Sequence, residues 1–167
     1  FNAVDPTGNK YSAFGDGIYK ANSSGGGVAT FSGSKGNGSA VNVRYDGILV
    51  YSDGTVRRAD YNNDTGNVAY GPGHAVKIAW NNTQSLFVYH NNNDIFTVTM
   101  GGIVNQVTST AGTEEITPAL SPNETKVIFV SNKEGNKDIF MANINGSNLV
   151  NLTNTPGVDE TLPDWSN

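Results

Sequence analysis

The sequence lacks cysteine, long apolar runs and an excess of positive charge, and each absence excludes a class of protein. None of the 167 residues is cysteine, which excludes disulfides, thiolate zinc sites and cysteine nucleophiles. No apolar run reaches the roughly 18 positions that a membrane-spanning helix needs, so no membrane span is expected. With ten Lys and Arg residues and a formal charge of −5, the chain lacks the basic surface of nucleic-acid binders, so nucleic acid is not an expected partner.

Helical periodicity is also missing, and strand patterns take its place. Apolar residues nowhere recur at i, i+3, i+4 and i+7 over eleven positions, because Gly or Asn interrupts almost every window. Short segments rich in β-branched and aromatic residues are instead separated by Gly, Asn and Asp turns, as at 126–130, 138–142 and 149–153. The sequence therefore predicts an all-β fold.

A repeat of about 45 residues organises the chain. Residues 101–122 align without a gap on residues 146–167, which places Glu115 on Glu160 and Pro118 on Pro163. Upstream, Asp94-Ile95-Phe96 lies on Asp138-Ile139-Phe140 at a spacing of 44. Weaker matches extend the template to the start of the chain. A period of this length with four strands in each repeat is typical of a β-propeller blade.

We therefore predict a single domain over residues 1–167, built as a β-propeller-like array of about four four-stranded blades. The approximate repeats are 1–41, 42–76, 77–116 and 117–161, and residues 162–167 begin a fifth. A large apolar residue recurs where each innermost strand begins, and we expect this series to pack between blades; its members are Val4, Tyr45, Trp80, Leu120 and Trp165. Four phenylalanines are expected in the core on the same argument: Phe87, Phe96, Phe129 and Phe140.

The best-preserved repeat resembles that of TolB-type β-propellers. The resemblance rests on TPALSPNETKVIFVSNKEGNKDIF at 117–140, followed by Asn-Gly-Ser at 145–147, Leu-Thr at 152–153 and Pro-Asp-Trp-Ser at 163–166. It is strong over 117–167, moderate over 77–116 and weak before residue 77. The resemblance implies an extracellular or periplasmic location, because TolB is a periplasmic protein-binding component of the cell envelope. Similar repeats form the non-catalytic propeller of prolyl-oligopeptidase-type peptidases.

The chain departs from this family in length. Six blades would need roughly 265 residues at the usual repeat length, whereas four repeats are present here. The chain is then a fragment of a longer propeller, a four-bladed ring, or a subunit whose ends pair with those of other chains. The third alternative is favoured by the recurrence of one element at 1–6 and 162–167, which allows strand addition between copies. Since residue 1 is Phe rather than Met, we expect a processed or trimmed chain.

Three functions remain open at this stage. The leading one is a non-enzymatic scaffold for protein interaction or assembly, such as a self-assembling filament subunit, whose partners are other proteins or copies of itself. The alternatives are a ligand- or peptide-binding propeller module and the non-catalytic propeller of a truncated hydrolase. Neither G-x-S-x-G nor H-E-x-x-H occurs, and the two histidines, His74 and His90, fall in predicted loops without a triad. We expect no cofactor and no metal.

Candidate binding residues lie in the loops before the innermost strands. Glu114 and Glu115 hold the same place as Asp159 and Glu160 one repeat later, and His74 falls nearly there in the second repeat. In a closed or curved array these side chains would form an acidic rim able to attract a cation or a basic peptide; otherwise they are solvated loop charges. Calcium at the Asn-rich loops 61–66 and 90–94 is a further alternative, although hairpin turns suit their spacing better.

Seven N-x-[S/T] sequons make Asn-linked glycans a further expected partner class. An Asn-rich set of turns accounts equally for 23 Asn residues in the chain. The candidate positions are Asn22, Asn37, Asn63, Asn81, Asn123, Asn145 and Asn151.

Overall fold

Every regular element that the computed structural model describes is a β-strand. The description covers residues 3–4, 7–14, 17–27, 29–30, 40–43, 48–52, 55–60, 65–72, 78–80 and 85–165. Within these ranges there is no helix, and so none that is long and apolar enough to cross a membrane.

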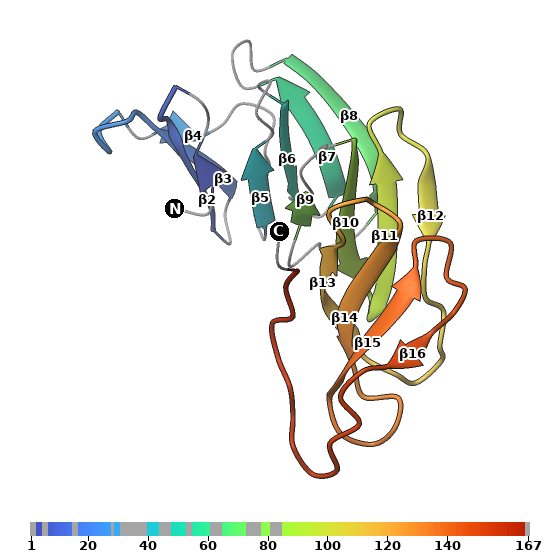
Figure 1. Ribbon diagram of the computed structural model, residues 1–167. Helices are drawn as coiled ribbons and strands as arrows, with labels where there is room; N and C mark the ends of the chain where they lie inside the picture. The colour runs from blue at the N-terminus through green and yellow to red at the C-terminus, as the bar shows by residue number, and fades with distance from the viewer. Residues whose placement is uncertain are drawn as a thin grey trace. The chain divides into compact units, whose positions relative to one another are not determined.

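Sixteen described strands form four antiparallel sheets of four strands each, and in every sheet the strands follow one another in chain order (Figure 1). We call these sheets the first to fourth blades. The first comprises β1 (Ala3–Val4), β2 (Lys10–Phe14), β3 (Gly17–Ala21) and β4 (Ala29–Thr30). The second comprises β5 (Ala40–Val43), β6 (Ile48–Ser52), β7 (Thr55–Asp60) and β8 (Thr65–Pro72). The chain divides into two compact units, and the first, residues 1–78, holds these two blades.

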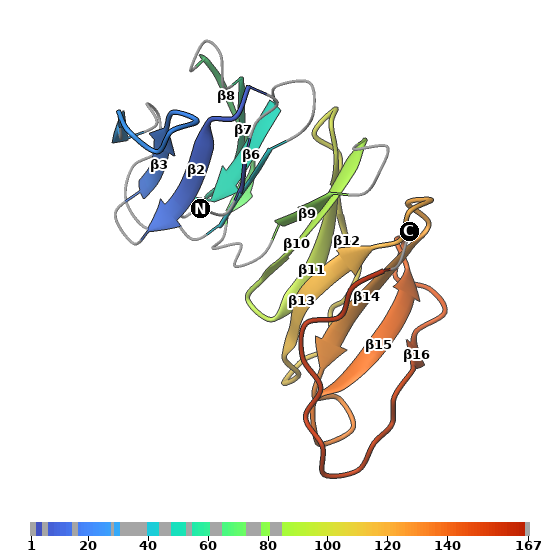
Figure 2. The same ribbon diagram turned by 60° about the vertical axis from the view of Figure 1, so that its left-hand side comes forward.

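The second unit, residues 79–167, holds the other two blades, except that β9 starts one residue before it. The third blade comprises β9 (Ile78–Trp80), β10 (Leu86–Asn91), β11 (Asp94–Thr99) and β12 (Val104–Gln106). The fourth comprises β13 (Glu115–Leu120), β14 (Lys126–Ser131), β15 (Asp138–Asn143) and β16 (Val150–Asn151), which follow one another across the sheet in Figure 2. Meandering four-stranded sheets repeated along the chain confirm the predicted all-β, propeller-like architecture.

Asparagine closes the hairpin of the third blade. Strands β10 and β11 are in register up to Asn91 and Asp94, so the turn consists of Asn92 and Asn93 alone. Their φ angles of 49° and 68° are both left-handed, as a two-residue type I′ turn requires. Because Asn tolerates this conformation better than other residues with a side chain, the Asn-rich run at 90–93 forms a hairpin turn. His90, predicted in a loop, is instead a buried residue of β10.

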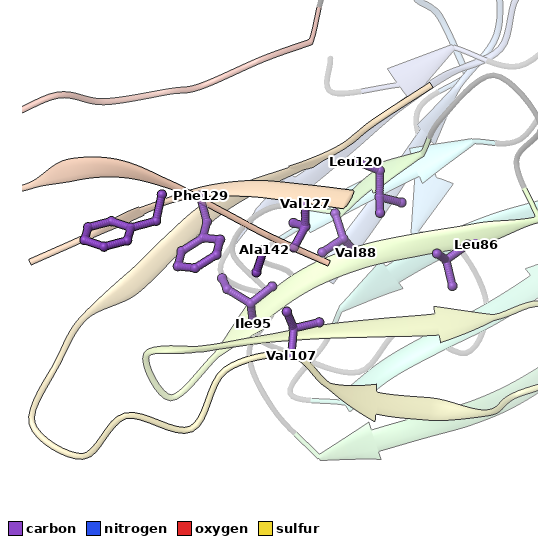
Figure 3. Packing of buried hydrophobic residues seen from close by; sticks show 9 residues of the cluster. Leu86, Val88, Ile95, Val107, Leu120, Val127, Phe129 and Ala142 are labelled. Atoms are coloured by element: carbon purple, nitrogen blue, oxygen red, sulfur yellow. The ribbon is translucent and has the colours of Figure 1, made fainter. Parts of the chain in front are cut away.

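The core of the second unit lies between the facing sides of the third and fourth blades (Figure 3). Strand alternation brings one apolar side chain in two to this interface, and each large one removed from water contributes about 1.5–3 kcal/mol. The third blade supplies Leu86, Val88, Ile95 and Val107, and the fourth supplies Leu120, Val127, Phe129, Phe140 and Ala142. Of the four predicted core phenylalanines, three are buried; Phe96 is half-buried and stacks on Tyr89 with ring centroids 5.4 Å apart.

The predicted series of inward apolar residues holds at Leu120 and fails at its first member, Val4, while Trp165 is half-buried. Leu120 is 5% exposed, whereas Val4 is 58% exposed. The repeat aligns Val4 with Leu120 and Tyr11 with Val127. Leu120 pairs with Val127, so Val4 would be expected to pair with Tyr11, but it pairs with Lys10 instead. This shift of one residue places Val4 on the face of Lys10 instead of the face of the buried Tyr11. The side chains of Tyr45 and Trp80 lie outside the described residues.

The repeat period changes within the fourth blade. Gly102 and Gly146 have φ angles of 87° and 83°, and each donates its N–H to the carbonyl three residues earlier at 2.9 and 2.8 Å. The turns at Gly102 and Gly146 are therefore equivalent at a spacing of 44 residues. The gapless alignment of residues 101–122 on 146–167 has a spacing of 45. The outer strands that follow are equivalent at a spacing of 45, because Gln106 and Asn151 hold the same pairing position. The fourth blade therefore has one additional residue between its turn and its outer strand. It lies close to Asn148, whose φ is 55°.

Candidate functional site

Residues 152–165 lie against the fourth blade as the segment leading into β13 lies against the third. The N–H of Glu115 donates to the carbonyl of Asn93 at 2.9 Å, and that of Glu160 donates to the carbonyl of Lys137 at 2.7 Å. Glu115 and Glu160 are equivalent residues of successive repeats, as are Asn93 and Lys137. Figure 1 shows this dark-red segment leaving β16 and returning past β13. We call residues 152–165 the C-terminal segment.

The C-terminal segment forms no strand, but it shares one backbone feature with β13. Thr117 and Leu162 have φ angles of 49° and 55°, and each precedes a buried proline, Pro118 or Pro163. A β-branched or bulky residue with positive φ is rare, so the recurrence marks a shared kink. The indole Nε1 of Trp165 donates to the carbonyl of Ala119 in β13 at 3.1 Å. The C-terminal segment is therefore equivalent to the innermost strand of a further blade.

A threonine hydroxyl fastens each of these segments to its blade. Oγ1 of Thr108 accepts a hydrogen bond from the N–H of Ile95 at 2.8 Å, and Oγ1 of Thr153 accepts one from the N–H of Ile139 at 3.0 Å. The threonines are the last residues of the recurring Val-Thr and Leu-Thr dipeptides. These bonds give one structural reason why the dipeptides recur.

Two carboxyl groups meet where the third blade joins the fourth. Glu115, predicted at the rim, is 1% exposed, and its Oε1 lies 3.0 Å from Oγ1 of Thr113. Burial, followed by the charge and hydrogen bonding of Glu115, raises the pKa of Asp94, and the amide of Gln106 opposes the shift with a 3.1 Å hydrogen bond. Oε2 of Glu115 is buried without a hydrogen-bond partner. We call Asp94 and Glu115 the inner acid pair.

The equivalent pair at the C-terminal segment is rich in donors. Asp138 is 1% exposed, and the Nδ2 of Asn151 donates to its Oδ2 at 2.8 Å. Oδ1 of Asp138 accepts from the Nδ2 of Asn136 at 2.9 Å and from the N–H of Thr155 at 3.3 Å. The bond from Asn151, together with those from Thr155 and Asn136, outweighs the effect of burial and lowers the pKa of Asp138. Glu160 itself accepts from Oγ1 of Thr153 at 3.0 Å. We call Asp138 and Glu160 the outer acid pair.

Lysine 137 joins the remaining two predicted rim acids. Its Nζ lies 2.7 Å from Oε2 of Glu114, and its N–H donates to Oδ1 of Asp159 at 2.9 Å. The hydrogen bond and charge of Glu114, with a smaller contribution from Asp159, raise the pKa of Lys137. The structure thus joins Glu114 to the ammonium of Lys137 and Asp159 to its backbone N–H. His74 lies outside the described residues, so the five predicted rim residues are not all placed.

A polar cavity of about 450 Å³ opens beside Glu114 in the second unit. It lies over the β10–β11 turn and the loop that leads into β13. Asp94 and Glu114 supply its carboxylates, and amide, hydroxyl and backbone groups supply most of the remainder. The lining comprises Asn92, Asn93, Asp94, Ser109, Thr110, Ala111, Gly112, Thr113, Glu114 and Asn132. In the described part of the chain, no group of three or more acidic or histidine side chains is placed to hold a metal ion.

Histidine 90 has a structural contact in this region. Its Nδ1 accepts the N–H of Thr117 at 3.3 Å, at the point where the pairing of β13 with β14 shifts register. The imidazole thereby satisfies a backbone donor at the bulge. The Oγ1 of Thr117 is buried and has no hydrogen-bond partner.

The described sequon asparagines all shape turns. Asn22, Asn123 and Asn145 are exposed, and the Oδ1 of each accepts a hydrogen bond from a Ser or Thr hydroxyl within the next two residues or from a nearby N–H. Asn151 differs because its Nδ2 also donates to Asp138 and, at 2.9 Å, to Glu134. Glycan attachment would use that nitrogen. Asn37, Asn63 and Asn81 lie outside the described residues, and occupancy of any sequon stays a prediction.

The sequence analysis identified Glu115 and Glu160 as candidate residues but not the side chains that lie beside them in the structure. Asp94 and Asp138 appeared only as the first letters of the repeated Asp-Ile-Phe, and Lys137 was not singled out. The available signal was the joint recurrence of Asp at the head of one strand and Glu about 21 residues later. Such recurrence within one chain indicates that the two positions meet in each repeat.

The comparisons with known proteins identify the fold. No protein-family model matches the chain, and no curated protein matches it. Among solved structures, one described as TolB from Agrobacterium tumefaciens aligns with a TM-score of 0.70 and 15% identity, over 88% of this chain and 58% of its own. The extracellular domain described for a one-component system of B. thetaiotaomicron aligns with a TM-score of 0.71 and 9% identity, over 97% of this chain and 23% of its own.

A third similar structure is that of a nidogen/laminin complex, with a TM-score of 0.61 and 12% identity over 84% of this chain and 59% of the matched chain. The chain therefore spans between about a quarter and three fifths of these three proteins. At such low identity the likeness concerns the fold. Together with the four meandering sheets and their 44- to 45-residue repeat, it shows that the chain has the fold of the TolB-like β-propellers.

Proposed function

We propose that the chain is a non-enzymatic, extracytoplasmic scaffold that binds other proteins, including copies of itself, by pairing at strand edges. The observation that carries this proposal is the C-terminal segment, which has the kink and the docking contacts of an innermost blade strand. Such a strand presents backbone groups to a neighbouring strand. Strand addition is a common way for proteins to recognise extended partners. A neighbouring copy that supplies the next strand would produce an open array or filament.

Exposed apolar side chains around the fourth blade support the same proposal. Val150 and Leu152 lie at the outer strand, and Val158 and Leu162 lie in the C-terminal segment; all four are at least 47% exposed. Val107, the counterpart of Leu152 one repeat earlier, is buried against the next blade. Leu152 therefore marks a surface that a neighbouring blade covers one repeat earlier.

Electron microscopy and light scattering of the purified chain test the proposal. We expect regular assemblies that are lost when residues 162–167 are deleted and weakened by Trp165→Ala. Lys133→Ala is the matched control and should leave assembly unchanged, because the Lys133 side chain is exposed and its backbone N–H bonds to Ser131 rather than to this segment. Discrete particles whose size is indifferent to the deletion would overturn the assembly proposal. Mass spectrometry before and after enzymatic deglycosylation tests for glycans at Asn22, Asn123 and Asn145.

A second candidate function is binding of a ligand or basic peptide at the rim. It is favoured by the polar cavity beside Asp94 and Glu114, whose carboxylates would attract a cationic group. Calorimetric titration with short Lys- or Arg-containing peptides tests this function, with Glu114→Gln as the variant and Glu134→Gln as an exposed control. Binding that survives Glu114→Gln unchanged would place the ligand elsewhere.

A further inference from the structure

The inner acid pair has fewer hydrogen-bond donors than its buried oxygens require. Oγ1 of Thr113 lies 3.0 Å from Oε1 of Glu115 and 2.8 Å from the carbonyl oxygen of Thr110. A hydroxyl carries a single hydrogen, so it cannot donate fully to both acceptors. Oε2 of Glu115 has no partner, and Gln106 serves only Asp94.

A proton on the pair removes this deficit. A protonated Glu115 would donate either to Thr113, which then donates to Thr110, or to the adjacent carboxylate of Asp94. Two ionised carboxylates in contact repel each other, and beside the buried carboxylate of Glu115 a proton shared with the partly buried Asp94 removes this repulsion. An unpaired buried carboxylate oxygen is costly, whereas a shared proton satisfies it without any added group.

We propose that Asp94 and Glu115 share one proton across the junction of the third and fourth blades, and that this proton makes the docking of the two blades pH-dependent. The raised pKa of Asp94 is consistent with this assignment. The site is a proton-binding site in the structural core of the repeat. It does not depend on assembly, and its Asp94 also lines the polar cavity at the rim.

The other titratable groups near the pair do not supply the missing donor. On β10, His90 directs its Nδ1 to the N–H of Thr117. In the loop before β13, Glu114 is bound to Lys137. On β12, Gln106 is neutral and donates to Asp94. None of these groups bonds to the buried Oε2 of Glu115.

The sign of the effect follows from proton linkage. The native junction binds a proton that the unfolded chain releases near the ordinary carboxyl pKa, so stability falls as the pH rises from that value through the raised native value. One proton changes the opening equilibrium by at most about tenfold per pH unit. The junction is thus tightest in mildly acidic solution and loosens towards alkaline pH until the proton has been released.

Hydrogen exchange of the full chain at pH 5 to 8 provides the local test. The amide of Glu115, which bonds to Asn93 across the junction, reports its opening after correction for intrinsic exchange rates. In the wild type we expect its protection factor to fall with rising pH by severalfold. In Glu115→Gln the added N–H replaces the proton, so the protection factor should become independent of pH and exceed that of the wild type at pH 8. Glu160→Gln in the outer acid pair is the matched control and should retain the wild-type slope.

Carbon-13 NMR of the carboxyl groups tests the proposal without any substitution, in case Glu115→Gln does not fold. We expect one carboxyl of the inner acid pair to remain protonated above the usual range of Asp and Glu. Ordinary titration of both groups would overturn the proposal. It would also be overturned if calcium or sodium ions raised the protection of the wild type but not that of Glu115→Gln, because the pair would then hold a metal cation.

Discussion

The inner and outer acid pairs are the same two residues of the repeat in different surroundings. At the inner pair, Asp94 has the amide of Gln106 as its donor and lies against a buried glutamate. At the outer pair, Asp138 receives N–H groups from Asn136, Asn151 and Thr155. The pKa of Asp94 is raised and that of Asp138 is lowered. Burial and the adjacent Glu115 outweigh the one donor at Asp94, whereas the N–H donors outweigh burial at Asp138, so the surroundings rather than the residue type set the sign of the shift.

The largest difference is expected between Leu120, at the junction of the third and fourth blades, and Trp165, where the C-terminal segment contacts the fourth blade. Leu120→Ala empties a site in the core between the third and fourth blades and should lower the free energy of unfolding by about 3 kcal/mol. Trp165→Ala removes a half-buried side chain and one hydrogen bond and should cost about 1 kcal/mol. Urea denaturation of both variants checks the order. Equal losses would show that the C-terminal segment is as firmly docked as β13.

Glycine at the turn of the fourth blade should reveal how closely the inner junction is packed. A Cβ on Gly146 would lie 2.5 Å from the carbonyl oxygen of Val107, and its φ is +83°. Gly146→Ala should destabilise the chain by about 2–3 kcal/mol, from backbone strain and displaced contacts. Gly157→Ala is the control, because its φ is +78° and nothing lies within 4 Å of the added methyl. It should cost only the backbone term, about 1 kcal/mol; equal losses for the two would mean that the contact with Val107 is unimportant.

Opposite pH responses should separate the two aspartates. The depressed pKa of Asp138 gives stability that is present above the ordinary Asp pKa and lost as the pH falls through the native value. Asp138→Asn should therefore destabilise the chain at neutral pH and reduce its acid sensitivity. Asp94→Asn should instead reduce the loss of stability as the pH rises, because the native pKa of Asp94 is raised. Thermal unfolding of both variants and the wild type at pH 3 to 8 measures these effects. If both substitutions changed the pH dependence of stability in the same direction, the comparison would be contradicted.

The rim ion pair should have the smallest effect. Lys137 and Glu114 have side chains about one third exposed, and such pairs contribute about 0.2–1 kcal/mol. Lys137→Gln should lower stability within that range at low salt and by less at high salt. A loss that salt leaves unchanged would indicate that the lysine acts through packing rather than charge. Lys133→Gln is the exposed control.

The sequence predicted the fold where the repeat was well preserved. Strands at 126–130 and 138–142 and the inward position of Leu120 follow from alternation and from the spacing of turns. The exposure of Val4 could not be predicted from the sequence. Val4 aligns with Leu120 in the repeat, and a sequence alignment does not reveal that the strand pairing has shifted by one residue. The partnership of Glu115 with Asp94 was missed because it joins two blades across a loop. The joint recurrence of Asp and Glu could have indicated it, whereas the hydrogen-bond donors around each pair follow only from the assembled sheets.

The additional residue of the fourth blade shows where this architecture tolerates changes in length. It lies near Asn148, which is exposed, between the turn and the short outer strand β16. The hydrogen bonds from Thr108 and Thr153 to their blades are nevertheless equivalent. The outer perimeter therefore absorbs insertions while the inner strands keep their spacing. A peptide tag or label grafted after Asn148 would extend from the perimeter without altering how successive blades stack.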